Sequence, residues 1–357
     1  MQTELFHQIL HDYWGYSSFR PLQEQIIQSV WEGRDTLGLM PTGGGKSLTF
    51  QVPVMGMKGI CLVVTPLISL MKDQVDNLRE KGIKAAAVYS GMSREEIITT
   101  LENCIFGDYK FLYVSPERLS SDIFISKLQA MEVCLLVVDE SHCISQWGYD
   151  FRPSYLKISG IRRLLEGVPL LALTATATRE VVDDIQEKLL FKEKNVFRKS
   201  FARHNLSYVV RKADNKLGEL IHILQTVPGT SIVYVRNRKQ TREIAISLKK
   251  AGITADFFHA GLSHEEKIYK QNAWKLNDCR VIVATNAFGM GIDKPDVRTV
   301  IHMDLPNSPE EYFQEAGRAG RDGERSYTII LYTASDSGKL KKRITDSFPD
   351  RDFILRV

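Results

Sequence analysis

The stretch Thr36-Leu-Gly-Leu-Met-Pro-Thr-Gly-Gly-Gly-Lys-Ser47 decides the fold. An apolar run leads into three glycines, and Lys46 and Ser47 stand directly before a helix-like segment. This order is typical of a phosphate-binding loop, because glycines let backbone amides approach a β-phosphate and the helix N-terminus adds partial positive charge. We expect Lys46 to bridge the β- and γ-phosphates of ATP and Ser47 to ligate Mg²⁺. The residues expected to bind nucleotide in this loop are Thr42, Gly43, Gly44, Gly45, Lys46 and Ser47.

The loop departs from the strict phosphate-loop pattern at one position, because Met40 stands where the first glycine is usual. A merely flexible glycine turn is the alternative interpretation. It leaves Lys46-Ser47 at the helix start without an explanation. The departure therefore indicates a subclass of nucleotide-binding protein.

A second apolar run, Val133–Asp139, ends in acidic residues. Asp139 at the carboxyl end of a strand is suited to hold Mg²⁺, through water or Ser47, and Glu140 is suited to polarise an attacking water. We expect His142 to couple this site to the next domain. An ordinary loop start is the alternative for the two acids.

Apolar strand-like runs alternate with helix-like segments along the whole chain. Continuous Val, Ile and Leu runs are typical of parallel strands that are covered on both faces, and alternation of strands and helices predicts right-handed crossovers. The fold class is therefore α/β, with two three-layer domains and mainly parallel sheets. The first series of predicted strands is Thr36–Met40, Ile60–Thr65, Ala85–Tyr89, Phe111–Ser115, Val133–Asp139 and Leu170–Thr174. The second series is Leu206–Val210, Ser231–Val235, Ala255–His259, Val281–Thr285, Thr299–Met303 and Tyr327–Tyr332.

The boundaries of helices and domains are also legible. Ser93 with Glu96 and Ser263 with Glu266 have the spacing of capping boxes, and Gly82 and Gly252 suit left-handed helix ends. The polar, basic segment near 198–206 separates the two strand series. We expect domains at 1–202 and 203–340, and the start of a truncated C-terminal extension at 341–357.

Composition excludes several classes of protein. The 357 residues are 43% apolar and 25% charged, which is ordinary for a globular chain and unlike a disordered, collagen-like or coiled-coil one. No apolar run approaches the roughly 18 residues that cross a bilayer, and residues 1–10 do not resemble a signal peptide. We expect a cytoplasmic protein with no membrane contact. The five cysteines form no C-x-x-C pair, so neither zinc nor a disulfide framework is expected.

Charge is distributed unevenly although the net charge is only +4. Residues 1–200 hold 22 basic and 24 acidic residues, whereas residues 201–357 hold 25 and 19. A basic second half indicates a polyanionic partner, and an ordinary solvated surface explains it equally well.

Two arginines lie in the second series, in Gln314-Glu-Ala-Gly-Arg-Ala-Gly-Arg321. Charge that develops on a transferred γ-phosphoryl group needs a cation from outside the phosphate loop, and Arg318 and Arg321 could supply it. A basic surface loop is the alternative. The residues alone thus predict an ATPase with its nucleotide between two domains.

The ordered motifs from about residue 5 to 335 resemble the RecQ family of superfamily 2 DNA helicases. The resemblance is carried by residues 14–23, 40–47, 65–70, 115–119, 139–142, 173–178, 258–262, 284–293 and 314–321. It implies two tandem RecA-like domains and ATP with Mg²⁺ as cofactors. It also implies that Tyr16 stacks on adenine, that Arg20 lines the pocket and that Gln23 binds the adenine edge. Gln314 joins the catalytic residues and Asp293 the nucleotide-binding ones by the same resemblance.

The segment Cys143-Ile-Ser-Gln-Trp-Gly-Tyr-Asp-Phe-Arg-Pro153 is similar to the aromatic-rich loop of that family. Exposed Trp147 and Phe151 could stack on unpaired bases, and Arg152 could add a cation–π or phosphate contact. Hydrophobic plugs of an interdomain core are the alternative for the two aromatics. Two departures from the family pattern are Ser141, in place of alanine, and Tyr149, where many relatives carry histidine. The zinc-binding and winged-helix modules that usually follow the family's core have no counterpart in the sequence.

The expected partners are single-stranded and tailed duplex DNA, gripped by loops at strand carboxyl ends. Translocation from 3′ to 5′ follows from resemblance only, and the chain is expected to be monomeric with protein partners left open. A DEAD-box RNA helicase is one alternative, and a DNA-stimulated ATPase with little unwinding is another. The residues expected to contact DNA are Thr65, Pro66, Arg118, Trp147, Phe151, Arg152, His259, Thr285 and Asn286.

Overall fold

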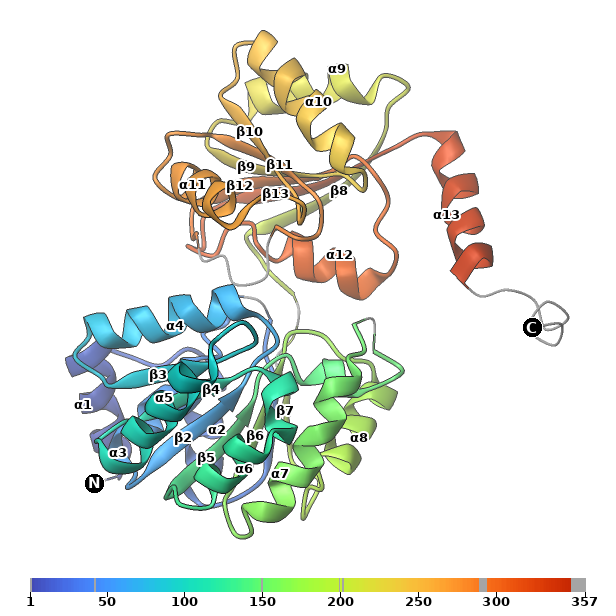
Figure 1. The fold of residues 1–357 in the computed structure, drawn as a ribbon. Coiled ribbons are helices and arrows are strands. Elements are labelled where there is room, and N and C mark those ends of the chain that lie inside the picture. Colours follow the sequence, from blue (N-terminus) through green and yellow to red (C-terminus); the bar gives the residue numbers. More distant parts are fainter. Residues whose placement is uncertain are drawn as a thin grey trace, which may run out of the picture. The chain divides into compact units, whose positions relative to one another are not determined.

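The computed structural model of the chain describes residues 2–41, 43–148, 150–198, 200, 202–288 and 294–347. It divides into two compact units, Met1–Phe201 and Ala202–Val357, called unit 1 and unit 2 below (Figure 1). Among the residues singled out above, Thr42, Tyr149 and Asp293 lie outside the described residues.

Unit 1 is built on a seven-stranded sheet whose strand pairs are all parallel, in the order β3-β4-β2-β5-β6-β1-β7. The strands are β1 (Thr36–Leu39), β2 (Ile60–Val64), β3 (Ala85–Val88), β4 (Phe111–Val114), β5 (Val133–Val138), β6 (Leu170–Thr174) and β7 (Val196–Arg198). The α-helices are α1 (Gln2–Trp14), α2 (Gln23–Trp31), α3 (Leu48–Gly56), α4 (Ile68–Glu80), α5 (Arg94–Phe106), α6 (Asp122–Leu128), α7 (Ile158–Leu164) and α8 (Arg179–Lys188). Three short 3₁₀ helices are η1 (Pro116–Ser120), η2 (Ser141–Ile144) and η3 (Pro153–Lys157).

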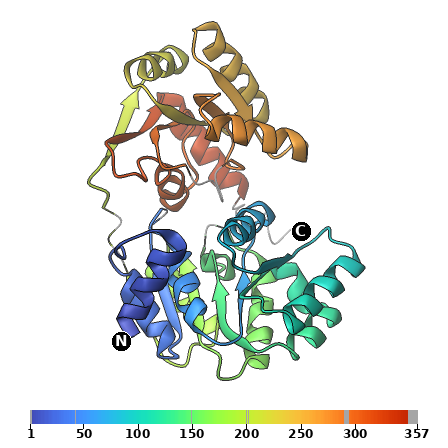
Figure 2. The same ribbon diagram turned by 90° about the vertical axis from the view of Figure 1, so that its left-hand side faces the viewer.

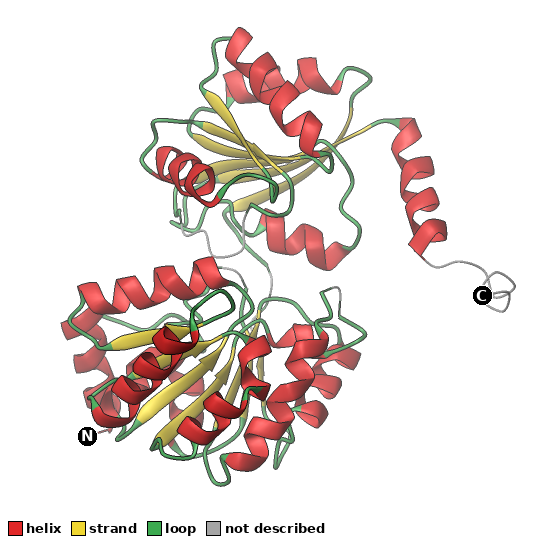
Figure 3. Cartoon of the chain, in the orientation of Figure 1, coloured by secondary structure: helices red, strands yellow, loops and turns green. Residues whose placement is uncertain are grey.

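Helices cover both faces of this sheet (Figures 2 and 3). Successive residues of a strand point to opposite faces, so neighbours in β2 belong to different cores. Leu62 and Val64 pack with α5, α6, α7 and α8, whereas Cys61 and Val63 pack with α2, α3 and α4. Burial on both sides explains why the strands read as unbroken apolar runs.

Unit 2 holds a six-stranded sheet whose pairs are also all parallel, in the order β10-β11-β9-β12-β13-β8. Separate apolar clusters form under α9 and α10 and around Trp274 of α11. The strands are β8 (Leu206–Lys212), β9 (Thr230–Tyr234), β10 (Ala255–Phe258), β11 (Val281–Ala284), β12 (Val297–His302) and β13 (Ser326–Tyr332). The helices are α9 (Lys216–Thr226), α10 (Arg238–Lys250), α11 (His264–Lys275), α12 (Pro309–Ala316) and α13 (Ala334–Ser347).

The predicted fold class is confirmed, since each predicted strand is present with its ends within two residues of the expected ones. Both capping boxes form, and Gly82 and Gly252 have φ angles of 75° and 79°. The prediction missed β7, which pairs with β1 at the sheet edge. The boundary expected between residues 340 and 341 falls inside α13.

Two further features concern the state of the cysteines and the length of the helices. All five cysteines are free, Cys61 is buried in the core, and Cys134 is partly buried against it. Among the described helices, none combines the length and the apolar character needed to cross a membrane.

Candidate functional site

Parallel pairing brings three loops of unit 1 to the same edge of its sheet. Strand β6 lies between β1 and β5, and the carboxyl ends of all three strands point the same way. The glycine loop follows β1, Asp139 and Glu140 follow β5, and Thr174 ends β6. The fold therefore assembles phosphate loop, acids and Thr174 side by side, where open α/β sheets bind ligands.

The glycines of the phosphate loop are required by its geometry. Gly43 and Gly45 have φ angles of 77° and 74°, in the region that L side chains rarely adopt. A Cβ at Gly44 would lie 2.8 Å from the carbonyl oxygen of Pro41, and one at Gly45 would lie 2.3 Å from Nε2 of Gln23. The loop is thus a backbone-lined cradle that an added methyl group would disturb.

Arg20 and Gln23 hold this loop through its carbonyl oxygens. Arg20 Nη1 donates to Gly43 O at 2.6 Å, and Gln23 Nε2 donates to Gly45 O at 2.9 Å. The backbone N–H of Arg20 in turn donates to Oε1 of Gln23 at 2.8 Å. Tyr16 nearby in sequence is 52% exposed. The adenine roles expected of these residues stay predictions, and the structure adds a positioning role for Arg20 and Gln23.

Lys46 and Glu140 face each other across the site. Lys46 Nζ lies 3.9 Å from Glu140 Oε1, and both side chains are mostly buried. Glu140 has φ 48° and ψ 45°, a left-handed conformation that costs a residue with a Cβ about 1–2 kcal/mol. Such strain persists only where the surrounding structure enforces it, and it is frequent at functional sites.

The surroundings of Asp139 favour the protonated form of its carboxyl group. Burial, together with the neighbouring Glu140 carboxylate, raises the pKa of this group to about 6, although Lys46 opposes the shift. The Asp139 carboxylate accepts the N–H of Glu140 at 3.0 Å, and its carbonyl oxygen accepts the hydroxyl of Tyr155 at 2.9 Å. Its carboxylate and the Ser47 hydroxyl are hard oxygen donors of the kind that Mg²⁺ prefers.

His142 connects Glu140 with strand β6. Its Nδ1 lies 2.9 Å from the Thr174 hydroxyl and 3.4 Å from Glu140 Oε2. Burial lowers the pKa of His142 despite the nearby carboxylates of Glu140 and Asp150, so the imidazole is neutral at physiological pH. His142 is therefore placed to fix the Glu140 carboxylate, and its expected coupling to the next domain stays a prediction.

The aromatic-rich loop presents one exposed and one half-buried ring. Trp147 is 78% exposed, so it does not belong to the core of unit 1, whereas Phe151 is partly buried. Arg152 donates to Asp150 Oδ2 from Nε at 3.2 Å and from Nη2 at 2.9 Å, and its Nη1 lies 3.4 Å from Pro66 O. Arg152 thus joins two of the segments expected to contact DNA.

The remaining DNA-contact candidates of unit 1 differ in how exposed they are. The Thr65 side chain is buried, with 1% of its surface accessible, and Pro66 is partly exposed. Arg118 is also partly exposed and donates from Nε to Tyr89 O at 3.2 Å. A ligand could approach Pro66 and Arg118 more readily than Thr65.

The two arginines of unit 2 lie on a clamped loop after α12. Gln314 is in the last turn of this helix, Arg318 is buried and Arg321 is half-buried. Asn205 Nδ2 donates to Gly320 O at 2.7 Å and to Glu324 O at 2.9 Å, and Arg203 Nη2 donates to Gly320 O at 2.6 Å. The start of unit 2 therefore holds the arginine loop, defined here as residues 317–324.

The second-unit residues expected to contact DNA lie at strand ends. Thr285, which is buried, and exposed Asn286 line a cavity of about 100 Å³ with Tyr234, His302 and Glu315. His259 is half-buried after β10. The cavity wall is braced by a buried pair in which His302 Nε2 lies 2.8 Å from Glu315 Oε2.

Several positioning residues were missed by the sequence analysis. Tyr155, Arg203 and Asn205 act through backbone carbonyl oxygens, which leave no pattern in the sequence. Thr174 could have been identified from the sequence, because it lies in Leu173-Thr-Ala-Thr-Ala-Thr178, one of the motifs that carry the family resemblance.

Comparison with protein families defines the class of the chain. Residues 20–185 match the DEAD/DEAH box helicase family, and residues 214–323 match the helicase conserved C-terminal domain. Solved structures support the fold: S. cerevisiae Dbp5 bound to RNA and ADP BeF3 aligns with a TM-score of 0.73 at 17% identity, covering 98% of this chain and 93% of that one. The DUF1998 helicase MrfA bound to DNA gives 0.77 at 18% identity, covering 96% and 53%. The family matches and the fold place the chain in the class of superfamily 2 helicase cores.

Curated relatives narrow this class. The probable ATP-dependent DNA helicase RecS of Bacillus subtilis is 43% identical over 92% of this chain and 67% of its own length. The ATP-dependent DNA helicase RecQ of the same organism is 44% identical over 92% of this chain and 56% of that relative. The chain belongs to the RecQ family of superfamily 2 DNA helicases. It spans between about half and two thirds of the length of these relatives, and the similarity does not favour the DEAD-box RNA helicase alternative.

Proposed function

We propose that this chain is an ATP-driven DNA motor that moves along single-stranded DNA from 3′ to 5′ and unwinds tailed duplexes, in the service of DNA repair and recombination. The observation that carries the proposal is the group formed by Lys46, Glu140, His142 and Thr174, beside a glycine loop of the required geometry. Family membership supports DNA as the substrate, since the relatives carry the name of ATP-dependent DNA helicase.

The chemistry of the first unit follows from the positions of its side chains. Lys46 would neutralise the β- and γ-phosphate oxygens, and Ser47 with Asp139 would hold Mg²⁺, which supplies charge neutralisation on the phosphates. Glu140 would accept a proton from the attacking water. His142, neutral and bound to Thr174, keeps the Glu140 carboxylate oriented for that step. Thr42, Gly43, Gly44 and Gly45 would bind the phosphates through backbone amides, and Tyr16, Arg20 and Gln23 would bind the base.

The second unit would complete the site. We assign to Arg318 and Arg321 the stabilisation of charge on the γ-phosphoryl group in the transition state. The clamp from Arg203 and Asn205 supports this role, because a catalytic arginine must be held in place before the reaction. Gln314 and Asp293 are proposed members of the same site. We further propose that the protein acts as a monomer.

Coupling to DNA would run through the aromatic-rich loop. A base stacked on Trp147 or Phe151 would displace the loop, and the loop is bonded to Pro66 through Arg152. The segment Asp139–Cys143 leads directly into this loop, so DNA binding would be felt at Glu140. Further backbone contacts are assigned to Thr65, Pro66, Arg118, His259, Thr285 and Asn286, which makes binding sequence-tolerant and salt-sensitive.

The test measures ATP turnover with and without single-stranded DNA, together with strand separation on duplexes that carry a 3′ or a 5′ tail. We expect DNA-stimulated turnover, separation of the 3′-tailed duplex, and a loss of turnover of roughly 10²–10⁴-fold in Glu140→Gln with nucleotide binding retained. Lys46→Ala serves as a second inactive variant.

Three outcomes would contradict the proposal. ATP turnover that is the same with and without DNA would contradict the proposed coupling. Stronger stimulation by RNA than by DNA would favour an RNA helicase. Separation of only the 5′-tailed duplex would contradict the proposed 3′ to 5′ polarity. Stimulated turnover without strand separation would instead identify a DNA-dependent ATPase.

A further inference from the structure

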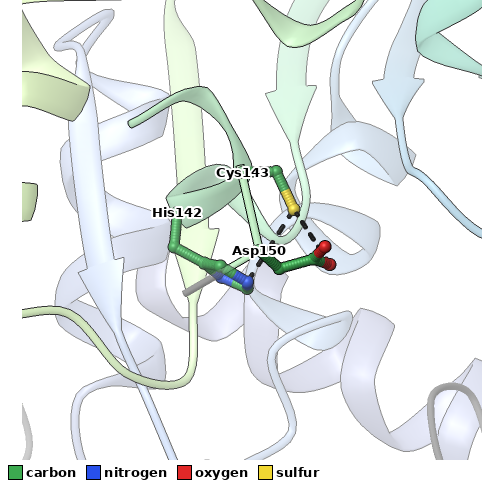
Figure 4. A group of neighbouring side chains, drawn as sticks. All are labelled: His142, Cys143 and Asp150. Atoms are coloured by element: carbon green, nitrogen blue, oxygen red, sulfur yellow. Dashed lines mark hydrogen bonds between the residues drawn. The ribbon is translucent and has the colours of Figure 1, made fainter. Parts of the chain in front are cut away.

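Three potential metal ligands converge beside Glu140 in unit 1. His142, Cys143 and Asp150 each offer one ligand atom, and these atoms all lie within 4.8 Å of one another (Figure 4). We propose that they form a binding site for Zn²⁺, and that its occupation restrains the coupling of DNA binding to ATP hydrolysis. This inference goes beyond the proposed motor function. The three residues include only one cysteine, so a search of the sequence for cysteine pairs does not detect them.

Two of the three ligand separations are close to those around a tetrahedral zinc ion. Cys143 Sγ lies 3.8 Å from His142 Nε2 and 3.8 Å from Asp150 Oδ2. Zinc–sulfur bonds of about 2.3 Å and zinc–nitrogen or zinc–oxygen bonds of about 2.0–2.2 Å imply ligand separations of about 3.5 Å at a tetrahedral angle. The two separations from Cys143 are therefore within a few tenths of an ångström of the bound values. The third, between His142 and Asp150, lies within 4.8 Å, so the Asp150 side chain would have to move by up to about 1 Å to complete the site.

The local backbone fixes this arrangement. His142 and Cys143 are consecutive in the 3₁₀ helix η2, and the N–H of Arg152 donates to the carbonyl oxygen of Cys143 at 2.9 Å. That hydrogen bond brings the returning chain, and with it Asp150, against Cys143. Because the three ligands come from one closed loop, no distant element has to move for them to meet.

The orientation of His142 is that of a metal-binding histidine. Its Nδ1 faces the hydroxyl of Thr174 and the carboxylate of Glu140, which leaves Nε2 directed toward Cys143 (Figure 4). Metal-binding histidines characteristically direct their second ring nitrogen to a carboxylate or another acceptor, which fixes the ring and raises its basicity. Here the carboxylate belongs to Glu140, the proposed general base. His142 is therefore a ligand of the proposed metal site and also a neighbour of the hydrolytic centre.

The ligand set selects the type of metal. A thiolate sulfur and an imidazole favour Zn²⁺ over Mg²⁺, which prefers oxygen donors only. On binding, the Cys143 thiol loses its proton to solvent and the sulfur forms a bond to zinc, with no change in oxidation state. Three protein ligands leave a fourth position for water. Asp150, whose side chain is 35% exposed, gives the ion access from solvent.

Occupation of the site would compete with an existing contact. Asp150 Oδ2 accepts hydrogen bonds from both Nε and Nη2 of Arg152. A bound cation would take this oxygen and repel the guanidinium, and Arg152 would lose its hold next to Pro66. The metal would then hold the aromatic-rich loop in place, and the loop would no longer respond to DNA binding. Zinc is thus an inhibitor of DNA stimulation in this proposal.

The experiment uses Co²⁺ as a spectroscopic substitute for Zn²⁺ on the full chain. We expect one Co²⁺ per chain to produce a cysteinate-to-cobalt charge-transfer band that added Zn²⁺ removes. Cys143→Ser should abolish the band, and Cys104→Ser, which changes another buried cysteine of unit 1, should retain it. Because Cys143 is buried and its variant could misfold, Asp150→Asn provides a second test at a partly exposed position. Loss of this ligand should weaken Co²⁺ binding by at least about 10-fold, since even changes in the surrounding shell cost 10–100-fold.

The spectroscopic readout does not depend on enzymatic activity, so it separates this proposal from the proposed motor function. Absence of a charge-transfer band in the unmodified chain, or an unchanged band in Cys143→Ser, would overturn the zinc site. In an active preparation, Zn²⁺ should lower DNA-stimulated turnover in the unmodified chain and do so less in Asp150→Asn. Equal inhibition of both would overturn the restraining role.

Discussion

At the scale of single residues, the left-handed conformation of Glu140 shows how the site is tuned. The strained backbone turns its carboxylate between Lys46 Nζ at 3.9 Å and His142 Nδ1 at 3.4 Å. An ordinary extended or helical conformation would point the side chain elsewhere. The strain of about 1–2 kcal/mol is thus the cost of placing one carboxylate between two partners.

Asp139 makes the affinity for Mg²⁺ depend on pH. Its folded-state pKa of about 6 lies above the usual value for aspartate, so the protonated form is favoured as pH falls below about 6. Only the carboxylate binds the cation, and affinity should therefore fall up to about tenfold per pH unit below that value. Calorimetric titration of Mg²⁺ with a non-hydrolysable ATP analogue checks this, with Asp139→Asn as the variant that should bind more weakly and lose the pH dependence. A flat profile in the unmodified chain would contradict the role of Asp139.

Trp147 should contribute to DNA binding by stacking. Truncation to alanine removes an exposed ring without opening a core, and loss of one base stack costs about 1–3 kcal/mol, or roughly 5- to 150-fold in affinity. Fluorescence polarisation with labelled single-stranded DNA measures the change, and ATP binding should be retained. Phe106→Ala is the matched control, because Phe106 on α5 is also a highly exposed aromatic, 86% accessible. If both variants bind DNA alike, Trp147 has no specific role.

At the scale of elements, buried strands were predictable and polar connections were not. Strand β5 reads Val133-Cys-Leu-Leu-Val-Val138, and sheet burial on both faces requires such a run. Strand β7, by contrast, has three residues with two of them exposed, and it exists because β1 offers an unpaired edge. Its sequence carries no signal of its own, since the partner determines the structure.

The site follows the same division. The residue types and spacing of the phosphate loop and of the two acids form a recognisable pattern, so Lys46, Asp139 and Glu140 could be singled out from the sequence. The hydrogen bonds of Arg20 and Gln23 to the loop carbonyls depend on how α2 packs, which spacing does not reveal. Local chemistry was thus predictable, and tertiary positioning was not.

The arginine loop offers an element-scale test of such positioning. A Cβ at Gly320 would lie 2.5 Å from Asn205 Nδ2 and 2.7 Å from Ser326 Oγ, so Gly320→Ala should displace the loop. We expect kcat to fall by roughly 10–100-fold with little change in nucleotide affinity, because misplaced catalytic groups lose rate. Gly323→Ala is the control: its φ of 90° imposes backbone strain, yet nothing lies within 4 Å of the added Cβ. Similar kcat values in the two variants would show that the clamp does not position the arginines.

At the scale of the whole molecule, a buried ion pair joins distant segments of unit 1. Arg162 Nη2 donates to both carboxylate oxygens of Asp35 at 2.8 and 3.0 Å, and both side chains are under 10% exposed. The same carboxylate accepts the N–H groups of Leu170 and Lys192. Segments more than 120 residues apart in the chain therefore meet at one side chain.

Removal of this carboxylate should destabilise unit 1 selectively. Asp35→Ala leaves the Arg162 guanidinium buried without its partner, which typically costs about 3–5 kcal/mol. Urea unfolding followed by circular dichroism should show an earlier transition for unit 1 and an unchanged one for unit 2. Lys194→Ala, which removes the exposed ion pair with Asp183, should leave both transitions in place. An equally small effect of Asp35→Ala would mean that solvent reaches the pair.

The clamp by Arg203 and Asn205 also governs how the chain can be dissected. These residues belong to the opening segment of unit 2, yet they fasten Gly320 and Glu324 more than 110 positions downstream. Anyone who expresses the second half alone has to place the cut ahead of residue 203. A cut a few residues later would remove the hydrogen bonds that hold the arginine loop, while the sheet could still fold. The mobility of the arginines in such a fragment would then result from the truncation and would not be a property of the intact unit.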